Sequence, residues 1–387
     1  MLLDYLFVLF FYFILNVKGA IINDTNKRWG NPIFFHIGRN VHPWYVNMAL
    51  SAIQQHTCIK FELKSEAEIK NKNGLKFIWA TTCGSGGVGR QIGSYPNQIL
   101  LGPECYTDII KIQRYIFFAL GMYSEHTRID RDTFVDVYPE NAFSDSRTYF
   151  ELNNAKTTTT FNSEYDFASI MHYNAFAFAR NSKNKTIVPK KHGKYYEKMM
   201  GQKTMVAFND YKLINFLYCS NTCKNTSVSC WRDGYEDPNN CGKCKCPFPF
   251  SGNICNGLIA NDDSYCYGNH FSVTKKEYAL AYGGFRSCYA YLDAPKDKLI
   301  SLEIILNFKN TNPCIRGDNV LEIKYREDKS VMGLCFCEKV EKYKFISESN
   351  LVVVIYKGYY AGDKATVIYS LAETQMKYRR RAIRSHK

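Results

Sequence analysis

The chain has 387 residues, of which 46% are apolar and 15% aromatic, so it can form packed cores in two or three domains and is not an intrinsically disordered protein. Its fifteen cysteines are typical of an oxidising compartment and argue against a cytosolic protein. The formal net charge of +14 comes from Lys and Arg spread along the whole chain, which is typical of a solvated surface and does not favour a nucleic-acid-binding protein.

The first predicted element is a secretion signal at residues 1–19. Residues 5–15 form a short apolar run, and the small residue Gly19 suits signal-peptide cleavage. A membrane anchor is the alternative, but the run is shorter than the ~20 residues that a bilayer requires, and no later stretch is long enough. We therefore expect a secreted, extracellular protein with no membrane span, whose mature chain begins at Ala20.

A strand, a helix and a second strand are predicted next. The strand covers residues 33–37, and apolar residues then recur at helical spacing between Val46 and Ile53 before a strand at residues 57–61. The segment 83–90 is rich in glycine, so a phosphate-binding loop is one alternative. It lacks the Gly-Lys-Ser/Thr ending of such loops, so the phosphate-binding interpretation is weak.

Residues 114–132, RYIFFALGMYSEHTRIDRD, carry the most specific pattern of the chain. They contain Ala-Leu-Gly at 119–121, then Glu125, then Arg-x-Asp-Arg-Asp at 128–132. This stretch resembles the astacin family of zinc endopeptidases, whose pattern begins His-Glu-x-x-His-Ala-Leu-Gly and adds a third His before the Glu. By this resemblance, the family's three zinc positions and its general-base position fall at Arg114, Phe118, Ser124 and Tyr115, respectively.

These four residues do not offer the family's chemistry. A guanidinium has only donors, a phenyl ring has no lone pair, and a serine hydroxyl is a poor zinc ligand. No His-Glu-x-x-His occurs in another register, and His126 and His172 are expected to be hydrogen-bonded structural residues. We therefore expect no catalytic residue, no metal ligand and no cofactor, with zinc bound only if the alternative of an active endopeptidase holds.

The surrounding segments keep other family positions. The apolar residues between Ile109 and Met122 predict a helix that is buried on all sides. Residues 169–173 resemble the family's Met-turn, which implies that Met171 lies beneath the metal position and that Tyr173 approaches it. The retained family positions are Gly121, Glu125, Met171 and Tyr173.

The resemblance also implies three local contacts. In the family, the mature amino terminus is buried against the Glu after the third ligand, so Ala20 is expected to pair with Glu125. Arg114 is expected to pair internally with Glu125 or Tyr173, and attraction of a carboxylate is the disfavoured alternative. Residues 97–101 fall where the family has its substrate-binding edge strand, so an extended peptide is a candidate ligand; the preferred alternative is that Tyr115 and Phe118 fill the cleft and leave a solid core.

The expected architecture has three parts. Residues 20–219 resemble an α+β, two-lobed astacin-like (metzincin) domain, and the six cysteines between 223 and 255 resemble a small disulfide-rich EGF-like module at 220–256. A zinc knuckle at Cys241 and Cys244 is a disfavoured alternative. Alternating residues at 300–308 and 319–326 and an apolar run at 351–356 predict strands of an all-β CUB sandwich at 262–371, followed by a basic tail at 372–387.

The family patterns imply six disulfides. They are Cys58 with Cys219, Cys83 with Cys105, Cys223 with Cys241, Cys230 with Cys244, Cys246 with Cys255, and Cys266 with Cys288. Cys314 is left to pair with either Cys335 or Cys337. The sequons at Asn23, Asn184 and Asn225 are possible glycan sites.

Three functions are compatible with these residues. The leading hypothesis is a secreted, inactive astacin-like protein that binds an extracellular protein or peptide. The alternatives are an active zinc endopeptidase and an adhesive or matrix protein that acts through its EGF-like and CUB modules.

Overall fold

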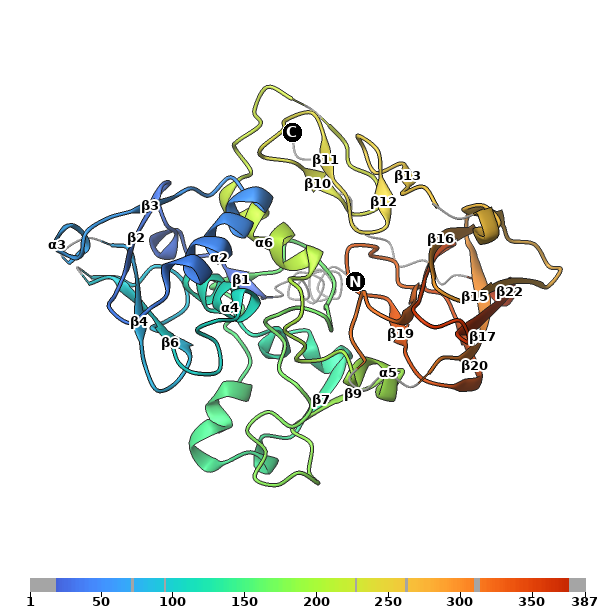
Figure 1. Ribbon diagram of the computed structural model, residues 1–387, viewed down its shortest axis with the longest axis horizontal. Coiled ribbons are helices and arrows are strands. Elements are labelled where there is room, and N and C mark those ends of the chain that lie inside the picture. The colour runs from blue at the N-terminus through green and yellow to red at the C-terminus, as the bar shows by residue number, and fades with distance from the viewer. Residues whose placement is uncertain are drawn as a thin grey trace, which may run out of the picture. The chain divides into compact units, whose positions relative to one another are not determined.

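The computed structural model describes residues 19–70, 73–93, 95–226, 228–261, 264–309 and 314–375 (Figure 1). The chain divides into two compact units. The first comprises the described residues up to Phe248 with Gly252–Asn256 and Ser330–Met332; the second comprises Pro249–Ser251, Gly257–Lys329 and the described residues from Gly333 onwards. The predicted signal segment before residue 19 and the basic tail after residue 375 lie outside the described residues. Within the described ranges, no helix is both long and apolar enough for a membrane crossing.

A five-stranded sheet begins the first unit, in the order β3-β2-β4-β6-β5. The first four of these strands run parallel to one another, and β5 is antiparallel to β6. The strands are β2 (Ile33–Ile37), β3 (Phe61–Leu63), β4 (Leu75–Trp79), β5 (Gly84–Ser85) and β6 (Asn97–Leu101). The prediction of a strand at 33–37 is confirmed.

The strand predicted at residues 57–61 is displaced, because β3 begins only at Phe61. The Thr57 hydroxyl donates to the Ile53 carbonyl over 2.7 Å at the end of the preceding helix. Cys58 is bonded to Cys219. These two anchors hold residues 57 and 58 to the helix end, so the extended conformation starts after them.

The strand expected at the edge of the sheet is present as β6, but it is not the edge. The two-residue strand β5 pairs with it, matching Gly84 to Leu100 and Ser85 to Ile99. The Gly86 N–H also donates to the Gln98 carbonyl over 2.8 Å. A pair of residues among glycines gives no periodic signal, which is why the sequence did not indicate β5. The outer strand is therefore β5.

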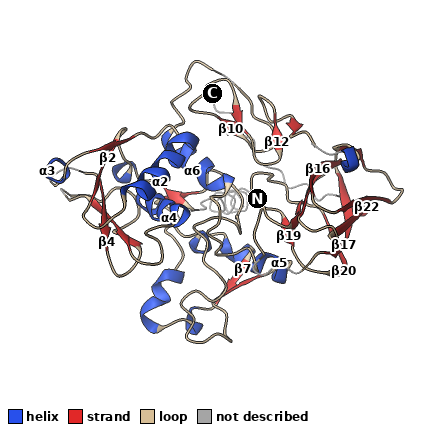
Figure 2. Ribbon diagram, viewed as in Figure 1, coloured by secondary structure: helices blue, strands red, loops and turns tan. Residues whose placement is uncertain are grey.

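Two long helices pack on this sheet and on each other (Figures 1 and 2). α2 (Pro43–His56) buries Val46, Ala49, Leu50 and Ile53, the spacing of one helical face. α4 (Ile109–Ala119) is capped by Asp108, whose carboxylate accepts from two backbone N–H groups of the first turn over 3.0 Å each. The other helices of this unit are α3 (Glu66–Ile69), α5 (Gly193–Glu197) and α6 (Phe208–Tyr218).

The chain between α4 and α6 consists mostly of turns. Its strands form two short antiparallel pairs, β1 (Ile21–Ile22) with β8 (Thr158–Thr159) and β7 (Val135–Val137) with β9 (Ile187–Pro189). The 3-10 helices of the unit are η1 (Thr25–Lys27), η2 (Glu125–Thr127), η3 (Arg131–Thr133), η4 (Pro139–Asn141) and η5 (Ser144–Phe150). The cysteine-rich segment adds β10 (Tyr235–Glu236) and β11 (Cys244–Lys245), and the Tyr235 ring lies 5.2 Å from the Phe208 ring of α6.

The second unit is a sandwich of two sheets, in the orders β14-β16-β21-β18-β19 and β15-β22-β17-β20 (Figure 2). Its strands are β14 (His270–Ser272), β15 (Tyr278–Gly283), β16 (Arg286–Asp293), β17 (Lys298–Asn307), β18 (Val320–Lys324), β19 (Leu334–Phe336), β20 (Val340–Ile346), β21 (Leu351–Gly358) and β22 (Lys364–Gln375). A hairpin of β12 (Phe250–Ser251) with β13 (Gly257–Leu258) and the 3-10 helix η6 (Ser264–Cys266) precede it. β17 alternates buried and less buried residues as predicted, and β21 is buried almost throughout.

One strand of this sandwich differs from its prediction. The alternation at 319–326 predicted a half-buried strand, but every residue of β18 is buried. Its polar residues have partners inside the unit, since Glu322 pairs with Arg316 at 3.1 Å and the Lys324 ammonium donates to the Lys329 carbonyl over 2.9 Å. Polar side chains can be buried when they have hydrogen-bond partners, so the alternation of polar and apolar residues in β18 did not show which of them are exposed.

The structure joins the same six cysteine pairs that the family patterns imply. It also bonds Cys314 to Cys337, which decides the pairing that the sequence left open. Cys335 lies buried in β19.

Candidate functional site

The site is built around the last two turns of α4 and the turn that follows it. Gly121 has φ 108°, and a Cβ there would lie 2.6 Å from the Ile22 side chain. Only glycine adopts this conformation without strain. The chain therefore turns away from the helix axis at this point, and the Glu125 N–H donates to the Met171 carbonyl over 3.3 Å.

Arg114 lies on the inner side of α4 and is 6% exposed. Its Nη1 donates to the carbonyl of Ile170. The guanidinium carbon lies 5.2 Å from the Phe118 ring centroid and 5.3 Å from that of Tyr173, within the range of cation–π contacts. Burial lowers the pKa of Arg114. The expected pairing with Tyr173 is thus present as a ring contact, and the expected pairing with Glu125 is not.

The prediction that α4 is buried on all sides is wrong. Lys111, Tyr115 and Phe118 recur at i, i+4 and i+7 and are only half-buried, so one strip of the helix is partly open. The Tyr115 and Phe118 rings stack at 6.5 Å with 27° between their planes. Burial raises the pKa of the Tyr115 phenol. Tyr115 and Phe118 pack against the core only in part, so an apolar helix need not be covered on every side.

Glu125 is buried and is held by Arg128. One carboxylate oxygen of Glu125 accepts from Arg128 Nη1 and from the Asp166 N–H, each over 2.9 Å. Arg128 also makes two parallel 2.9 Å hydrogen bonds to Asp130. Burial raises the pKa of Glu125 to about 7 against the opposing charge of Arg128. The Ala20 N–H, which is a peptide group here, donates to the Thr159 carbonyl over 2.8 Å, so its pairing with Glu125 stays a prediction for the processed chain.

Two buried histidines lie beside Tyr173. His172 has its ring nitrogens 2.6 Å from the Tyr165 hydroxyl and 2.6 Å from the Tyr173 carbonyl, and burial lowers its pKa to about 3. His126 has Nε2 3.0 Å from the Tyr149 carbonyl, and its ring lies 4.3 Å from the Tyr173 ring. Burial also lowers the pKa of His126 well below its ordinary value. Both are therefore neutral, hydrogen-bonded residues, as expected.

The turn that contains Met171 is fixed by Asp210, from the first turn of α6. One Asp210 oxygen accepts from the Ser169 hydroxyl over 2.6 Å; the other accepts from the N–H groups of Ile170 and Ala207 over 3.0 and 3.1 Å. Burial raises the pKa of Asp210 to about 6. Met171 is fully buried behind this turn.

Sequence reasoning assigned no role to Asp210 or to Lys203. The Lys203 ammonium donates to the His172 carbonyl over 2.8 Å, so the turn accepts one cation at Ile170 and another at His172. An acidic residue in the first turn of a helix was the available signal for Asp210. Backbone acceptors such as Ile170 leave no trace in a sequence, and the lysine was therefore not predictable.

The side chains at the family's metal positions do not match the ligands of zinc. Arg114 offers only donors, Phe118 offers a ring, and Ser124 is a buried hydroxyl. Across the described ranges, no three His, Cys, Asp or Glu side chains are grouped so as to hold a metal ion.

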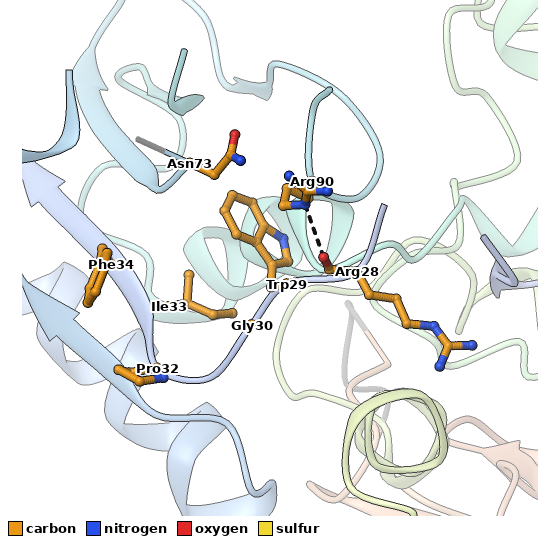
Figure 3. Close-up of a pocket in the computed structure, with 8 residues that line it drawn as sticks. All are labelled: Arg28, Trp29, Gly30, Pro32, Ile33, Phe34, Asn73 and Arg90. Atoms are coloured by element: carbon orange, nitrogen blue, oxygen red, sulfur yellow. Dashed lines mark hydrogen bonds between the residues drawn. The ribbon is translucent and has the colours of Figure 1, made fainter. Parts of the chain in front are cut away.

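A separate pocket of about 380 Å³ lies at the start of the domain (Figure 3). It is lined by Arg28, Trp29, Gly30, Pro32, Ile33, Phe34, Asn73 and Arg90. Arg90 Nε donates to the Arg28 carbonyl over 3.1 Å, and the Trp29 indole N–H donates to the Ala119 carbonyl over 2.7 Å. This pocket contains no residue of α4 or of the Met171 turn, and its walls serve to anchor the end of α4.

Comparison with known proteins identifies the family of the first domain. Residues 21–219 match the sequence model of the Astacin family of peptidases. The chain is 30% identical over 352 residues to zinc metalloproteinase nas-34 of Caenorhabditis elegans and 28% identical over 370 residues to zinc metalloproteinase dpy-31 of Brugia malayi. Each match covers 90% of this chain but only 56% and 59% of the relatives, so the chain spans little more than half of their length.

Among solved structures, high choriolytic enzyme 1, a hatching enzyme zinc-protease from Oryzias latipes, aligns with a TM-score of 0.46 and 24% identity. The alignment covers 52% of this chain and 98% of that one. The family assignment rests on the sequence match, which spans half of the chain and includes the Gly121 turn, Glu125 and the Met171 turn. The chain therefore belongs to the astacin family of peptidases.

Proposed function

We propose that this chain is a catalytically inactive member of the astacin family that acts outside the cell by binding a protein or peptide. The observation that carries the proposal is the Arg114 guanidinium, buried between the Phe118 and Tyr173 rings and tied to the Ile170 carbonyl. In the family, this part of the helix supplies a zinc ligand. A fixed positive charge there repels a metal cation, and the guanidinium has no lone pair with which to coordinate the metal.

The missing base is a second support. Tyr115 takes the place of the family's Glu, and its pKa is raised, so it is a neutral phenol near neutral pH. A neutral phenol does not accept a proton from water as a carboxylate does. Without a metal and without a base there is no route to an activated water.

An extracellular location is supported by the disulfides. Seven are formed within the described residues, a number that is typical of secreted proteins. We assign residues 1–19 to a signal peptide, 20–219 to the astacin-like domain, 220–256 to an EGF-like module and 262–371 to a CUB domain. Asn23, Asn184 and Asn225 are exposed, as glycan acceptors must be.

The decisive experiment measures zinc and peptide cleavage in the purified full chain. We expect no stoichiometric zinc and no cleavage. The control is a variant that carries Arg114→His, Tyr115→Glu, Phe118→His and Ser124→His together, which recreates the family pattern and should take up about one zinc per chain. Stoichiometric zinc in the unaltered chain, with cleavage that a chelator abolishes, would establish the alternative of an active zinc endopeptidase.

Binding of an extended peptide is the activity that the outer strand supports. The Gly86 N–H bonds to the Gln98 carbonyl, and hydrogen-bonded pairs alternate in an antiparallel ladder. The backbone groups of Ser85 therefore point away from β6, toward an incoming strand. Strand addition at such an edge provides affinity without a catalytic group.

This binding is tested by Ser85→Pro, which removes the outward N–H and leaves the ladder to β6 intact. We expect the variant to bind a pool of short synthetic peptides more weakly than the unaltered chain does. Ser85→Ala keeps the N–H and is the matched control. If all three bind the pool equally, the outer strand β5 is not the binding surface and the EGF-like and CUB modules carry the function.

A further inference from the structure

Exposed aromatic rings gather on one surface of the first unit, between η5 and β9. Phe178 is 40% exposed, and its ring stacks on that of Tyr149 at 5.0 Å with 22° between the ring planes. Tyr149 is 53% exposed, and Phe176, two residues before Phe178, is also exposed. Phe143 is exposed as well, and its N–H donates to the Phe178 carbonyl over 3.0 Å. We call these four residues the ring surface. Several exposed rings together, unlike a single one, indicate a surface that another group covers.

The backbone of Phe178 gives independent support for a role of this ring. Its φ is 55°, in the left-handed region, which is unfavourable for a bulky side chain and is kept only where other contacts compensate. Inside the domain, the Phe178 ring meets the rings of Tyr173 at 5.5 Å and Phe150 at 6.3 Å. The rest of the ring faces solvent, so a strained residue presents an apolar face outward.

The sequon at Asn184 lies beside the ring surface. The Thr186 N–H donates to the Ala175 carbonyl over 2.8 Å, and the Thr186 hydroxyl donates to the Ala177 carbonyl over 2.9 Å. The Lys185 ammonium lies 5.8 Å from the centroid of the Phe176 ring. Asn184 directly precedes Lys185 in the chain, which places its Cα about 3.8 Å from that of Lys185.

The attachment point of a sugar at Asn184 is fixed by a turn. The Oδ1 atom of Asn181 accepts from the Asn184 N–H over 3.0 Å and from the Lys183 N–H over 2.9 Å. The Asn184 side chain is exposed and forms no hydrogen bond to any residue that the structure describes. A sugar attached to a fixed backbone loses less conformational freedom when it packs on a neighbouring surface.

We propose that an N-linked glycan on Asn184 packs across the ring surface and covers it. One face of a sugar ring consists of C–H groups, which pack on the electron-rich face of an aromatic ring while the hydroxyl groups stay in water. The inference rests on the extracellular location proposed above and does not depend on the loss of catalysis. A ring surface covered in this way is not available to a protein partner.

The charges around the rings favour a neutral occupant. Residues 140–151 carry three acidic side chains and one basic side chain. Residues 176–185 carry three basic side chains, of which Lys185 is paired with Glu197 at 2.8 Å. The remaining charges of the two segments balance, so the surface attracts neither an anionic nor a cationic partner. An uncharged sugar fits this balance.

The test compares one sample of the full chain before and after removal of its glycans. The chain is secreted from cultured eukaryotic cells, and mass spectrometry determines whether Asn184 carries a glycan. Hydroxyl-radical oxidation followed by mass spectrometry then measures the accessibility of the rings with and without peptide N-glycosidase treatment. We expect oxidation of Tyr149, Phe176 and Phe178 to rise at least about twofold when the glycans are removed.

The variant Asn184→Gln should reproduce this rise in an otherwise glycosylated chain. Asn225→Gln removes a sequon from the cysteine-rich segment and is the matched control, which should leave the oxidation of the three rings unchanged. Circular dichroism shows whether each variant is folded. The comparison with peptide N-glycosidase needs no variant.

Equal oxidation of the rings with and without the Asn184 glycan overturns the inference. Rings that stay protected in both samples are covered by something else, such as a second copy of the chain, and rings that are oxidised readily in both are not covered at all. A secreted chain with an unoccupied Asn184 refutes the glycan contact alone. A chain that is retained in the cytosol with no glycan at any sequon refutes the extracellular location as well.

Discussion

The imidazole of His172 shows how a single buried residue makes stability depend on pH. It lies between the Tyr165 hydroxyl and the Tyr173 carbonyl, and burial lowers its pKa from 6.5 to about 3. A folded-state pKa below the unfolded value stabilises the fold above pH 6.5, and this stabilisation is lost as the pH falls toward 3. The full shift corresponds to an upper limit of about 5 kcal/mol.

We therefore expect His172→Gln to flatten the fall in the free energy of unfolding between pH 6.5 and 4, measured by urea titration at several pH values. Glu125 and Asp210 act in the opposite sense, because their raised pKa values, about 7 and about 6, destabilise the fold as the pH rises through them. Both remain in the variant, so the difference between the two proteins isolates the histidine. Parallel pH profiles would contradict the assignment.

Individual side-chain pairings also show what could not be predicted from the sequence. The family pattern assigned Arg114, Phe118 and Ser124 to the three zinc positions, and the structure places the Arg114 guanidinium over the Phe118 ring. It did not indicate that Glu125 pairs with Arg128, or that Arg114 bonds to a backbone carbonyl. Pairings of this kind depend on three-dimensional placement, which no local pattern carries.

At the scale of elements, the end of α4 depends on one glycine. Gly121 has a positive φ, and a Cβ would lie 2.6 Å from Ile22. We expect Gly121→Ala to lower the free energy of unfolding by about 1–3 kcal/mol, since it combines backbone strain with a clash against a buried side chain. Gly193→Ala is the control because a Cβ there meets nothing within 4 Å, and it should change stability little. Similar effects in urea unfolding would refute the role of the turn.

Elements were predictable where a period repeats over several residues. The strands β2, β17 and β21 follow their sequence patterns for this reason. β5 was missed because two residues carry no period, and β6 was consequently taken for the edge. The helix α4 was predicted, but its half-buried strip was not, because tertiary packing decides which side of an apolar helix is covered.

At the scale of the molecule, the disulfide from Cys58 to Cys219 closes the first domain across 161 residues. Restriction of the unfolded chain grows with loop length, so replacing both cysteines with Ala should lower the free energy of unfolding by about 5 kcal/mol. The Cys83–Cys105 bond spans only 22 residues, and its removal should cost about 3 kcal/mol. Urea unfolding followed by circular dichroism compares the two double variants. A larger loss from the shorter loop would mean that native-state contacts decide the effect.

Asp210 separates the residues that support the fold from the residues at the family's metal positions. A carboxylate from α6 holds the Met171 turn by two hydrogen bonds, from the Ser169 hydroxyl and the Ile170 N–H, so a residue outside the family's metal positions fixes the shape of the turn. The residue that fixes this turn, Asp210, is therefore different from the residues at the family's metal positions. The side chains at positions 114, 118 and 124 make none of these hydrogen bonds, so substitutions there need not disturb the turn.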